Sequence, residues 1–213
     1  MRILRVPGVF VPRSDTWLLA AHLRRQPQAR GAVLDVCTGS GALAVAAALA
    51  SATSVTAVDV SRRALLSARI NARLNGVKVR TRRGSLLDAV PGERFDLIVS
   101  NPPYLPGDDT DVSGEARHIE GGFDGRELLD RLIAAAPAHL NPGGLLMVTH
   151  SSINGEEETL ERMREAGLTP GVVAREDGPL GPLLSARART LEDRGLLAPG
   201  ERREDLLIVA GSA

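Results

Sequence analysis

AVLDVCTGSGALAVAAALASATSVTAVD, residues 32–59, decides the fold of this 213-residue chain. A short apolar strand, 32–35, ends in the acid Asp35, and the glycine-rich turn 36–41 follows it. The run 42–50 favours a helix, and a second strand, 54–59, ends in another acid, Asp59. Strand, tight turn, helix and strand in this order predict a βαβ unit of a parallel α/β sheet.

The turn between the first strand and the helix predicts a nucleotide-type cofactor. Gly39 and Gly41 let the backbone approach a ligand closely, and the new helix presents free N–H groups at its positive end. Asp59 follows the turn by about 20 residues, where a carboxylate binds ribose hydroxyls in such units. A complete G-x-G-x-x-G is absent because Ala44 takes the third position, and no Gly-Lys-Ser/Thr follows. S-adenosylmethionine is therefore favoured over NAD or ATP.

A second motif, Asn101-Pro-Pro-Tyr104, ends the apolar run 95–100. Consecutive prolines force a stiff, extended turn and have no N–H groups, so nearby carbonyls face outward. The Asn101 side chain and the Pro102 carbonyl could accept both hydrogens of a planar amide or amino group, with Tyr104 as a flat wall. We therefore predict Asn101, Pro102 and Tyr104 as catalytic residues; a plain strand-ending turn is the alternative.

The rest of the chain alternates helices and strands. Predicted helices cover 13–25, 62–75 after Ser61, a segment from 124 or 125 to about 139, and 156–166. Further predicted strands cover 77–83, 95–100, 145–151, 169–174 and 206–210. Residues 141–144, Asn-Pro-Gly-Gly, are expected to turn. Two segments lie outside this pattern, the acidic loop 107–114 and an insertion, 176–205, between the last two strands. Both are candidates for substrate or partner contact.

Five segments in order resemble the class I S-adenosylmethionine-dependent methyltransferases, and among them the HemK/PrmC-type release-factor glutamine methyltransferases. They are Val11-Pro-Arg-Ser-Asp-Thr16, the turn 34–41, Val58-Asp59, Asn101-Pro-Pro-Tyr104 and Gly121-Gly-Phe-Asp-Gly125. The resemblance spans roughly residues 9–150. It implies a three-layer αβα sandwich, Rossmann-like, with seven strands that are mostly parallel and an antiparallel last strand. The chain reaches Pro12 almost at once, which resembles the short form without the N-terminal helical domain.

This resemblance implies one methyltransferase domain over 1–213, in which the N-terminal segment 1–30 covers the cofactor. The residues expected to bind S-adenosylmethionine are Pro12, Thr16, Asp35, Thr38, Gly39, Gly41, Asp59, Val60, Ser85, Leu86 and Asn101. Asp35 either contacts the cofactor or organises the loop amides, and Pro12 and Thr16 either line the pocket or start a helix. Two positions depart from the family: Cys37 replaces the first loop glycine, and Ser85 replaces an adenine-binding acid.

Composition limits the functions that this chain can have. Lys and Arg total 26, as do Asp and Glu, so no global positive field attracts nucleic acid, although the total leaves a local basic face open; duplex DNA is disfavoured but not ruled out. The single Cys37 forms no internal disulfide, is read as a small buried hydrophobe, and no metal site is expected. No apolar run reaches the ~20 residues of a membrane span, so we expect a cytoplasmic protein. His150 is read as a core or rim histidine.

Three functions remain open at this stage. The first is methylation of a protein glutamine, in the Gly-Gly-Gln loop of a release factor, with a small activating subunit as an expected partner. The second is methylation of an adenine or guanine amino group in RNA or DNA, which neutral charge and scarce aromatic residues disfavour. The third is methylation of a small biosynthetic metabolite under a lid formed by 176–205.

Overall fold

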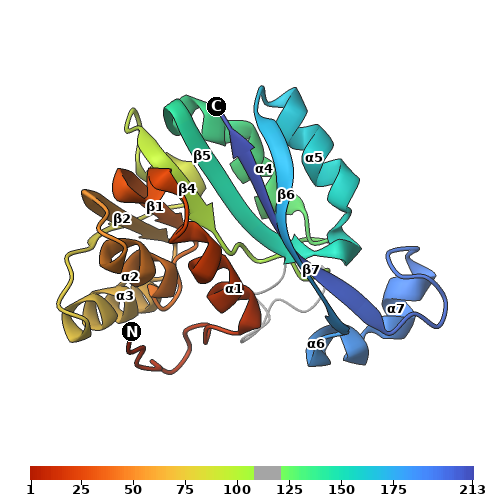
Figure 1. Cartoon of the computed structure of the whole chain (residues 1–213). Helices are drawn as coiled ribbons and strands as arrows, with labels where there is room; N and C mark the ends of the chain where they lie inside the picture. Colours follow the sequence, from red (N-terminus) through yellow and green to blue (C-terminus); the bar gives the residue numbers. More distant parts are fainter. Residues whose placement is uncertain (108–120) are drawn as a thin grey trace.

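A seven-stranded sheet with helices on both faces forms the molecule, as the computed structural model shows (Figure 1). The structure describes residues 1–107 and 121–213. The strand order is β3-β2-β1-β4-β5-β7-β6. The strands are β1 (Ala32–Val36), β2 (Ser54–Asp59), β3 (Arg80–Arg83), β4 (Phe95–Ser100), β5 (Leu140–Ser151), β6 (Thr169–Pro179) and β7 (Arg203–Ser212).

Two helical layers enclose the sheet. On one face lie α1 (Ser14–Leu23), α2 (Ala42–Leu49) and α3 (Arg62–Leu74), and on the other lie α4 (Glu127–Ala135) and α5 (Glu156–Glu165) (Figure 1). Short 3-10 helices are η1 (Pro27–Arg30), η2 (Leu86–Ala89), η4 (Ala136–His139) and η5 (Ser152–Asn154). Each face buries its own cluster of aliphatic side chains, centred on Leu34, Ile98 and Leu146 under α4 and on Val33, Leu97 and Met147 under α2. The predicted three-layer αβα fold is confirmed.

The relative directions of the strands agree with the prediction as well. β1 pairs in parallel with both β2 and β4, and β7 runs antiparallel to β5 and β6. The chain moves outward from β1 to β3 and then returns to β4 on the other side of β1. Ligands of open α/β sheets bind at this reversal, beyond the carboxyl ends of the strands. The predicted Gly-rich turn follows β1, and Asn101 follows β4, so both motifs lie there.

Several predicted boundaries differ from the structure for identifiable reasons. The Asn141-Pro-Gly-Gly144 segment belongs to β5, because Phe95 pairs with Leu140 and Leu97 with Leu145, which leaves an irregularity in the register. β6 extends to Pro179 and β7 already starts at Arg203, so the pairing of these two strands continues into the predicted insertion. The predicted helix up to His139 ends as α4 at Ala135 and continues as the 3-10 helix η4.

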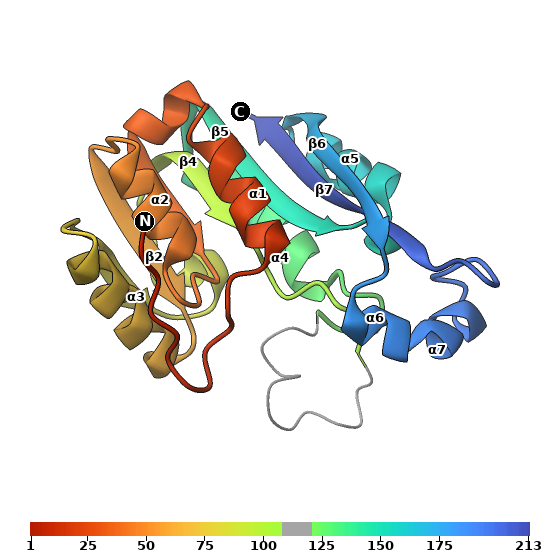
Figure 2. The same ribbon diagram turned by 60° about the horizontal axis from the view of Figure 1, so that its bottom comes forward.

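The remaining part of the insertion forms α6 (Pro182–Ala186) and α7 (Ala188–Asp193). Figures 1 and 2 show these helices beyond the end of the sheet, where the long β7 reaches toward them. Leu180, Leu184, Leu191 and Leu197 bury one another there and pack on Ile153, in a cluster separate from the two main cores. Most of the acidic loop 107–114 lies outside the described residues. No described helix is both long and apolar enough to cross a bilayer.

Candidate active site at the carboxyl ends of β1 and β4

Asp35 supports the glycine-rich loop from beneath. Its carboxylate accepts hydrogen bonds from the Thr38 hydroxyl at 2.5 Å and the Ala44 amide at 2.9 Å, and the side chain is fully buried. Its other oxygen, Oδ1, is buried without a partner among the described residues. Burial raises the pKa of Asp35 to about 7, although these two hydrogen bonds lower it. Asp35 thus joins the loop to the start of α2.

The loop takes left-handed backbone conformations at three positions. Cys37 has φ +59°, Gly39 +50° and Gly41 +81°. A Cβ at Gly41 would lie 2.7 Å from the Ala68 Cα, so glycine there lets α2 pack closely on α3. A Cβ at Gly39 would meet nothing nearer than 3.9 Å, which leaves open space above its backbone. Cys37 is an L-residue in a conformation that favours glycine, so its departure from the family pattern carries backbone strain.

Asp59 ties the end of β2 to the same loop. Its Oδ2 accepts from the Gly39 amide at 2.9 Å, and its Oδ1 accepts from the Ser61 amide at 2.8 Å. A carboxylate has about four acceptor positions, so each oxygen can still accept a ligand hydroxyl.

A cavity of about 150 Å³ lies over these groups. Nine of the predicted cofactor-binding residues line it, namely Pro12, Thr16, Thr38, Gly39, Asp59, Val60, Ser85, Leu86 and Asn101. The structure places Asp35 and Gly41 behind the wall, where they support the loop. The N-terminal residues Gly8, Val9 and Phe10 close one side, within the segment 1–30 that is expected to cover the cofactor.

The Asn101 side chain is held in one orientation. Its Nδ2 donates to Asp15 Oδ2 and to Thr16 Oγ1, both at 3.0 Å. A flipped amide would place its oxygen against the Asp15 carboxylate, so these two acceptors assign the nitrogen. Among the described residues, no group donates to Asn101 Oδ1. This oxygen remains as an acceptor at the cavity.

Asp15 is the residue that sequence reasoning missed. It is only 6% exposed, and its Oδ2 also accepts from the Tyr104 hydroxyl at 3.1 Å, while Oδ1 accepts from the Thr16 amide at 2.6 Å. Burial, followed by the charge of Asp15, raises the pKa of Tyr104 well above its usual value. Asp15 therefore positions both ends of the Asn101-Pro-Pro-Tyr104 motif. The available signal was its place inside Pro12-Arg-Ser-Asp-Thr16.

The Gly121–Gly125 stretch holds the motif from the opposite side. A Cβ at Gly121 would lie 2.5 Å from the Pro103 carbonyl oxygen, and one at Gly125 would collide with the Tyr104 carbonyl. Asn154 Nδ2, also missed, donates to the Tyr104 carbonyl at 2.7 Å and to the Asp124 carbonyl at 3.0 Å. The glycines are needed here for close backbone approach, and the motif is fixed on two sides.

A second, larger cavity of about 570 Å³ opens on the other side of Asn101. Asn101, Pro103 and Phe10 line both cavities, whereas Pro102 and Tyr104 line the larger one alone. Residues 176–184, from the end of β6 into α6, form its outer wall. Among the described residues, its lining carries the acids Asp15, Glu176, Asp177 and Glu204 and one base, Arg13. The two cavities meet at Asn101.

Two other titratable groups stay outside this chemistry. Burial raises the pKa of the Cys37 thiol to about 12, so it is not a ready nucleophile. Burial lowers the pKa of His150 to about 4, and its Nε2 is buried without a partner in the described part of the chain. Within residues 1–107 and 121–213, no three His, Cys, Asp or Glu side chains are arranged to hold a metal ion.

Sheet order, glycine-rich loop and the acceptor motif after β4 together define a class I methyltransferase. Residues 1–166 match the family model of the methyltransferase small domain. The chain belongs to this methyltransferase family.

Relatives agree with the resemblance seen in the sequence. A putative protein N5-glutamine methyltransferase of Methanocaldococcus jannaschii is 34% identical over 184 residues, which cover 85% of this chain and 92% of the relative. A release factor glutamine methyltransferase of Geobacter sulfurreducens is 44% identical over 152 residues. That match covers 67% of this chain and 53% of the relative's length. The predicted kinship with glutamine methyltransferases is confirmed.

A solved structure extends the likeness over nearly the whole chain. It is a chain of the E. cuniculi Mtq2–Trm112 complex, described as responsible for methylation of the eRF1 translation termination factor. The TM-score is 0.67 at 26% identity, and the match covers 96% of this chain and 98% of that chain.

Proposed function

We propose that this chain transfers a methyl group from S-adenosylmethionine to the side-chain amide nitrogen of a glutamine, in the Gly-Gly-Gln loop of a peptide release factor. The observation that carries the proposal is the orientation of Asn101. Its amide nitrogen is occupied by Asp15 and Thr16, so Oδ1 is the acceptor offered at the junction of the two cavities.

The residues around the smaller cavity fit S-adenosylmethionine. Asp59 has acceptor capacity left for ribose hydroxyls, and the open space above Gly39 admits a ligand against the backbone. The N-terminal end of α2 favours the anionic end of the ligand. Ser85 and Leu86 line the wall where we place the adenine. When bound, this cofactor supplies an electrophilic methyl group on a sulfonium.

The chain contributes mainly orientation to the reaction. A glutamine amide nitrogen is a weak nucleophile, because its lone pair is delocalised into the carbonyl. Asn101 Oδ1 and the Pro102 carbonyl accept its two hydrogens, hold the nitrogen in plane and raise its electron density. The ring of Tyr104 restrains the amide, and the proton that nitrogen loses passes to water or to these acceptors. No described side chain is required as a strong base.

The charge of the larger cavity favours a protein acceptor over a nucleic acid. Among the described residues four acids and one base line it, and the excess stays negative although Asp177 pairs with Arg203, so a phosphate backbone entering there would be repelled. An amide is uncharged and meets no such penalty. The cavity is also open to segment 176–184, which gives a peptide loop a surface to lie on.

We place this activity in the cytoplasm, because the named relatives act on release factors or on a ribosomal protein. The structural relative was solved as a complex with Trm112, so we include a small activating subunit among the partners. The single-domain organisation over 1–213, with residues 1–30 covering the cofactor, belongs to the same proposal. Gly8, Val9 and Phe10 support it by lining the cofactor cavity.

The test is transfer of labelled methyl from S-adenosylmethionine to a purified release factor from the same organism. Its Gly-Gly-Gln to Gly-Gly-Ala variant and total RNA are run in parallel. Label on the unmodified factor alone supports the proposal. Absence of label there, with cofactor binding intact by calorimetry and after addition of a Trm112-like subunit, refutes it; label on RNA instead would identify a nucleobase acceptor.

A further inference from the structure

Charge is divided between the two parts of the chain, although the total is zero. Residues 1–83 contain 14 Lys and Arg against three Asp and Glu, a net charge of +11. Residues 84–213 contain 12 against 23, a net charge of −11. The neutral sum therefore conceals a strongly basic part. The expectation of no global positive field rested on this sum and left a local basic face open.

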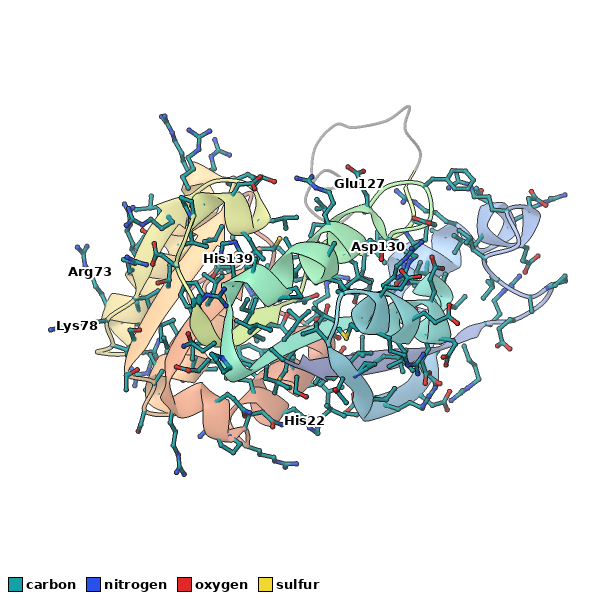
Figure 3. All side chains as sticks on the ribbon, turned by 90° about the horizontal axis from the view of Figure 1, so that it is seen from above. His22, Arg73, Lys78, Glu127, Asp130 and His139 are labelled. Atoms are coloured by element: carbon teal, nitrogen blue, oxygen red, sulfur yellow. The ribbon has the colours of Figure 1, made fainter. Side chains whose placement is uncertain are left out.

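The basic residues concentrate on α3 and the edge strand β3. Residues 60–87 contain no acid, and all their cations are exposed: Arg62, Arg63, Arg69, Arg73, Lys78, Arg80, Arg82 and Arg83. Asn71 and Asn75 bind the backbone of Leu4 and Arg2, which brings the exposed Arg2 and Arg5 to α3. We call these ten cations the basic face. Figure 3 shows Arg73 and Lys78 pointing outward at one end of the molecule, away from Glu127 and Asp130.

The basic face has only one counter-ion among residues 1–107 and 121–213. Arg80 pairs with Glu93, and the other nine form no ion pair with a described residue. Charged residues on an edge strand also discourage β-pairing with other chains. That role accounts for β3 but not for the cations of α3. Nine unpaired like charges repel one another, and an anionic partner removes that cost.

The spacing of the arginines suits a phosphate backbone. Arg62, Arg69 and Arg73 lie on one side of α3, because their separations of seven and four residues match helical turns. They span about 16 Å, the rise of about five nucleotides in one strand. Arg69 donates to Thr81 at 2.7 Å, which places this row beside β3. Nine of the ten cations are arginines, whose planar guanidinium can bind phosphate through two hydrogen bonds.

The absence of aromatic residues near these cations indicates which kind of nucleic acid the basic face fits. Residues 54–94 contain no Phe, Trp or Tyr. Recognition of single strands uses aromatic side chains that stack on bases, and membrane-surface helices use Trp and Phe as anchors. A face with cations but no rings suits a double helix, whose bases are already stacked and whose phosphates are exposed.

We propose that the basic face docks the enzyme on the phosphate backbone of a double-helical nucleic acid that is not the methyl acceptor. The face adjoins the rim of the smaller cavity through Val60, whose carbonyl accepts from Arg83 at 3.1 Å. Three of the four acids that line the larger cavity, Glu176, Asp177 and Glu204, belong to the acidic part of the chain, residues 84–213. A docked duplex thus leaves the acceptor cavity free for a protein.

The experiment measures anisotropy of a labelled duplex of about 20 base pairs, as RNA and as DNA of the same sequence, with the full chain. With about six phosphates neutralised, we expect affinity to fall ~10³-fold between 50 and 200 mM salt. A variant with Arg73→Glu, Lys78→Glu and Arg82→Glu should bind about 100-fold more weakly at 50 mM salt, and its salt dependence should weaken. The RNA and DNA arms decide which duplex is preferred.

The matched control reverses three exposed arginines outside the basic face, with Arg131→Glu, Arg164→Glu and Arg189→Glu. It has the same net charge as the first variant and should retain the wild-type affinity. Equal binding by wild type and the first variant would overturn the proposal, as would equal loss in the control. So would binding to phosphatidylserine vesicles or polyglutamate with none to duplexes. Methylation of the duplex itself would overturn its role as a platform, independently of whether release factor is labelled.

Discussion

Replacing Asp15 by alanine tests the positioning of the acceptor motif. Asp15 Oδ2 accepts from Asn101 Nδ2 at 3.0 Å and from the Tyr104 hydroxyl at 3.1 Å. A hydrogen bond to a charged group contributes at least about 1.5 kcal/mol, so the two together contribute about 3 kcal/mol to holding the motif. If that energy fixes Asn101 for the transition state, its loss lowers kcat about 10²-fold.

The assay combines steady-state methyl transfer to the labelled acceptor with calorimetry of S-adenosylmethionine binding. We expect the Kd of the cofactor to change less than about threefold, because Asp15 lines only the larger cavity. Asp15→Asn should lose less than Asp15→Ala, since one acceptor oxygen remains. Glu127→Gln removes an exposed carboxylate on α4 and should behave as wild type.

Retention of kcat within about threefold in Asp15→Ala, beside a large loss in Asn101→Ala, would refute this reasoning. Equal losses in kcat and in cofactor affinity would instead show that Asp15 maintains the smaller cavity.

Four further outcomes are expected. Asn101→Ala should lower kcat far more than cofactor affinity, and Asp59→Ala should do the reverse; calorimetry beside turnover separates the two. Cys37→Gly should keep the free energy of unfolding in urea within about 1 kcal/mol, because relief of the φ +59° strain offsets the added chain entropy, whereas Cys37→Val should lose stability. The pKa of His150 is about 4 folded and 6.5 unfolded, so the unfolded state binds more protons between these values and stability falls as pH drops from 6.5 to 4. In urea titrations at these two pH values, the free energy of unfolding of His150→Leu should fall by about 3 kcal/mol less than that of the wild type. Gly125→Ala should displace the Tyr104 carbonyl and lower the melting temperature and kcat together; an unchanged melting curve would contradict the contact.

Local signals made the geometry around the smaller cavity predictable. The loop after β1, its glycines and Asp59 lie within one βαβ unit, so chain order already places them together. The acceptor side depends on contacts between distant residues. Asp15 meets Asn101 and Tyr104 across 86 and 89 positions, and no local pattern encodes such a contact.

Pairing between strands explains the errors in the predicted boundaries. Asn141-Pro-Gly-Gly144 carries a strong turn signal, yet the pairing of Phe95 with Leu140 extends β5 through it. Similarly, β6 continues to Pro179 and β7 begins at Arg203, because each strand supplies the backbone hydrogen-bond partners of the other. The charge division, by contrast, was readable from the sequence, and a single total concealed it.

The separate small core under α6 and α7 has a consequence for engineering. Leu180, Leu184, Leu191 and Leu197 bury one another together with Ile153. Segment 176–205 meets the rest of the chain through this cluster, through the ends of β6 and β7, and through Arg187 and Arg194, which donate to the carbonyls of Pro106 and Phe123. The loops that line the smaller cavity come from elsewhere in the chain. Replacing this segment with the corresponding segment of a relative is therefore a way to change which acceptor is bound in the larger cavity, while the residues of the smaller cavity stay unaltered.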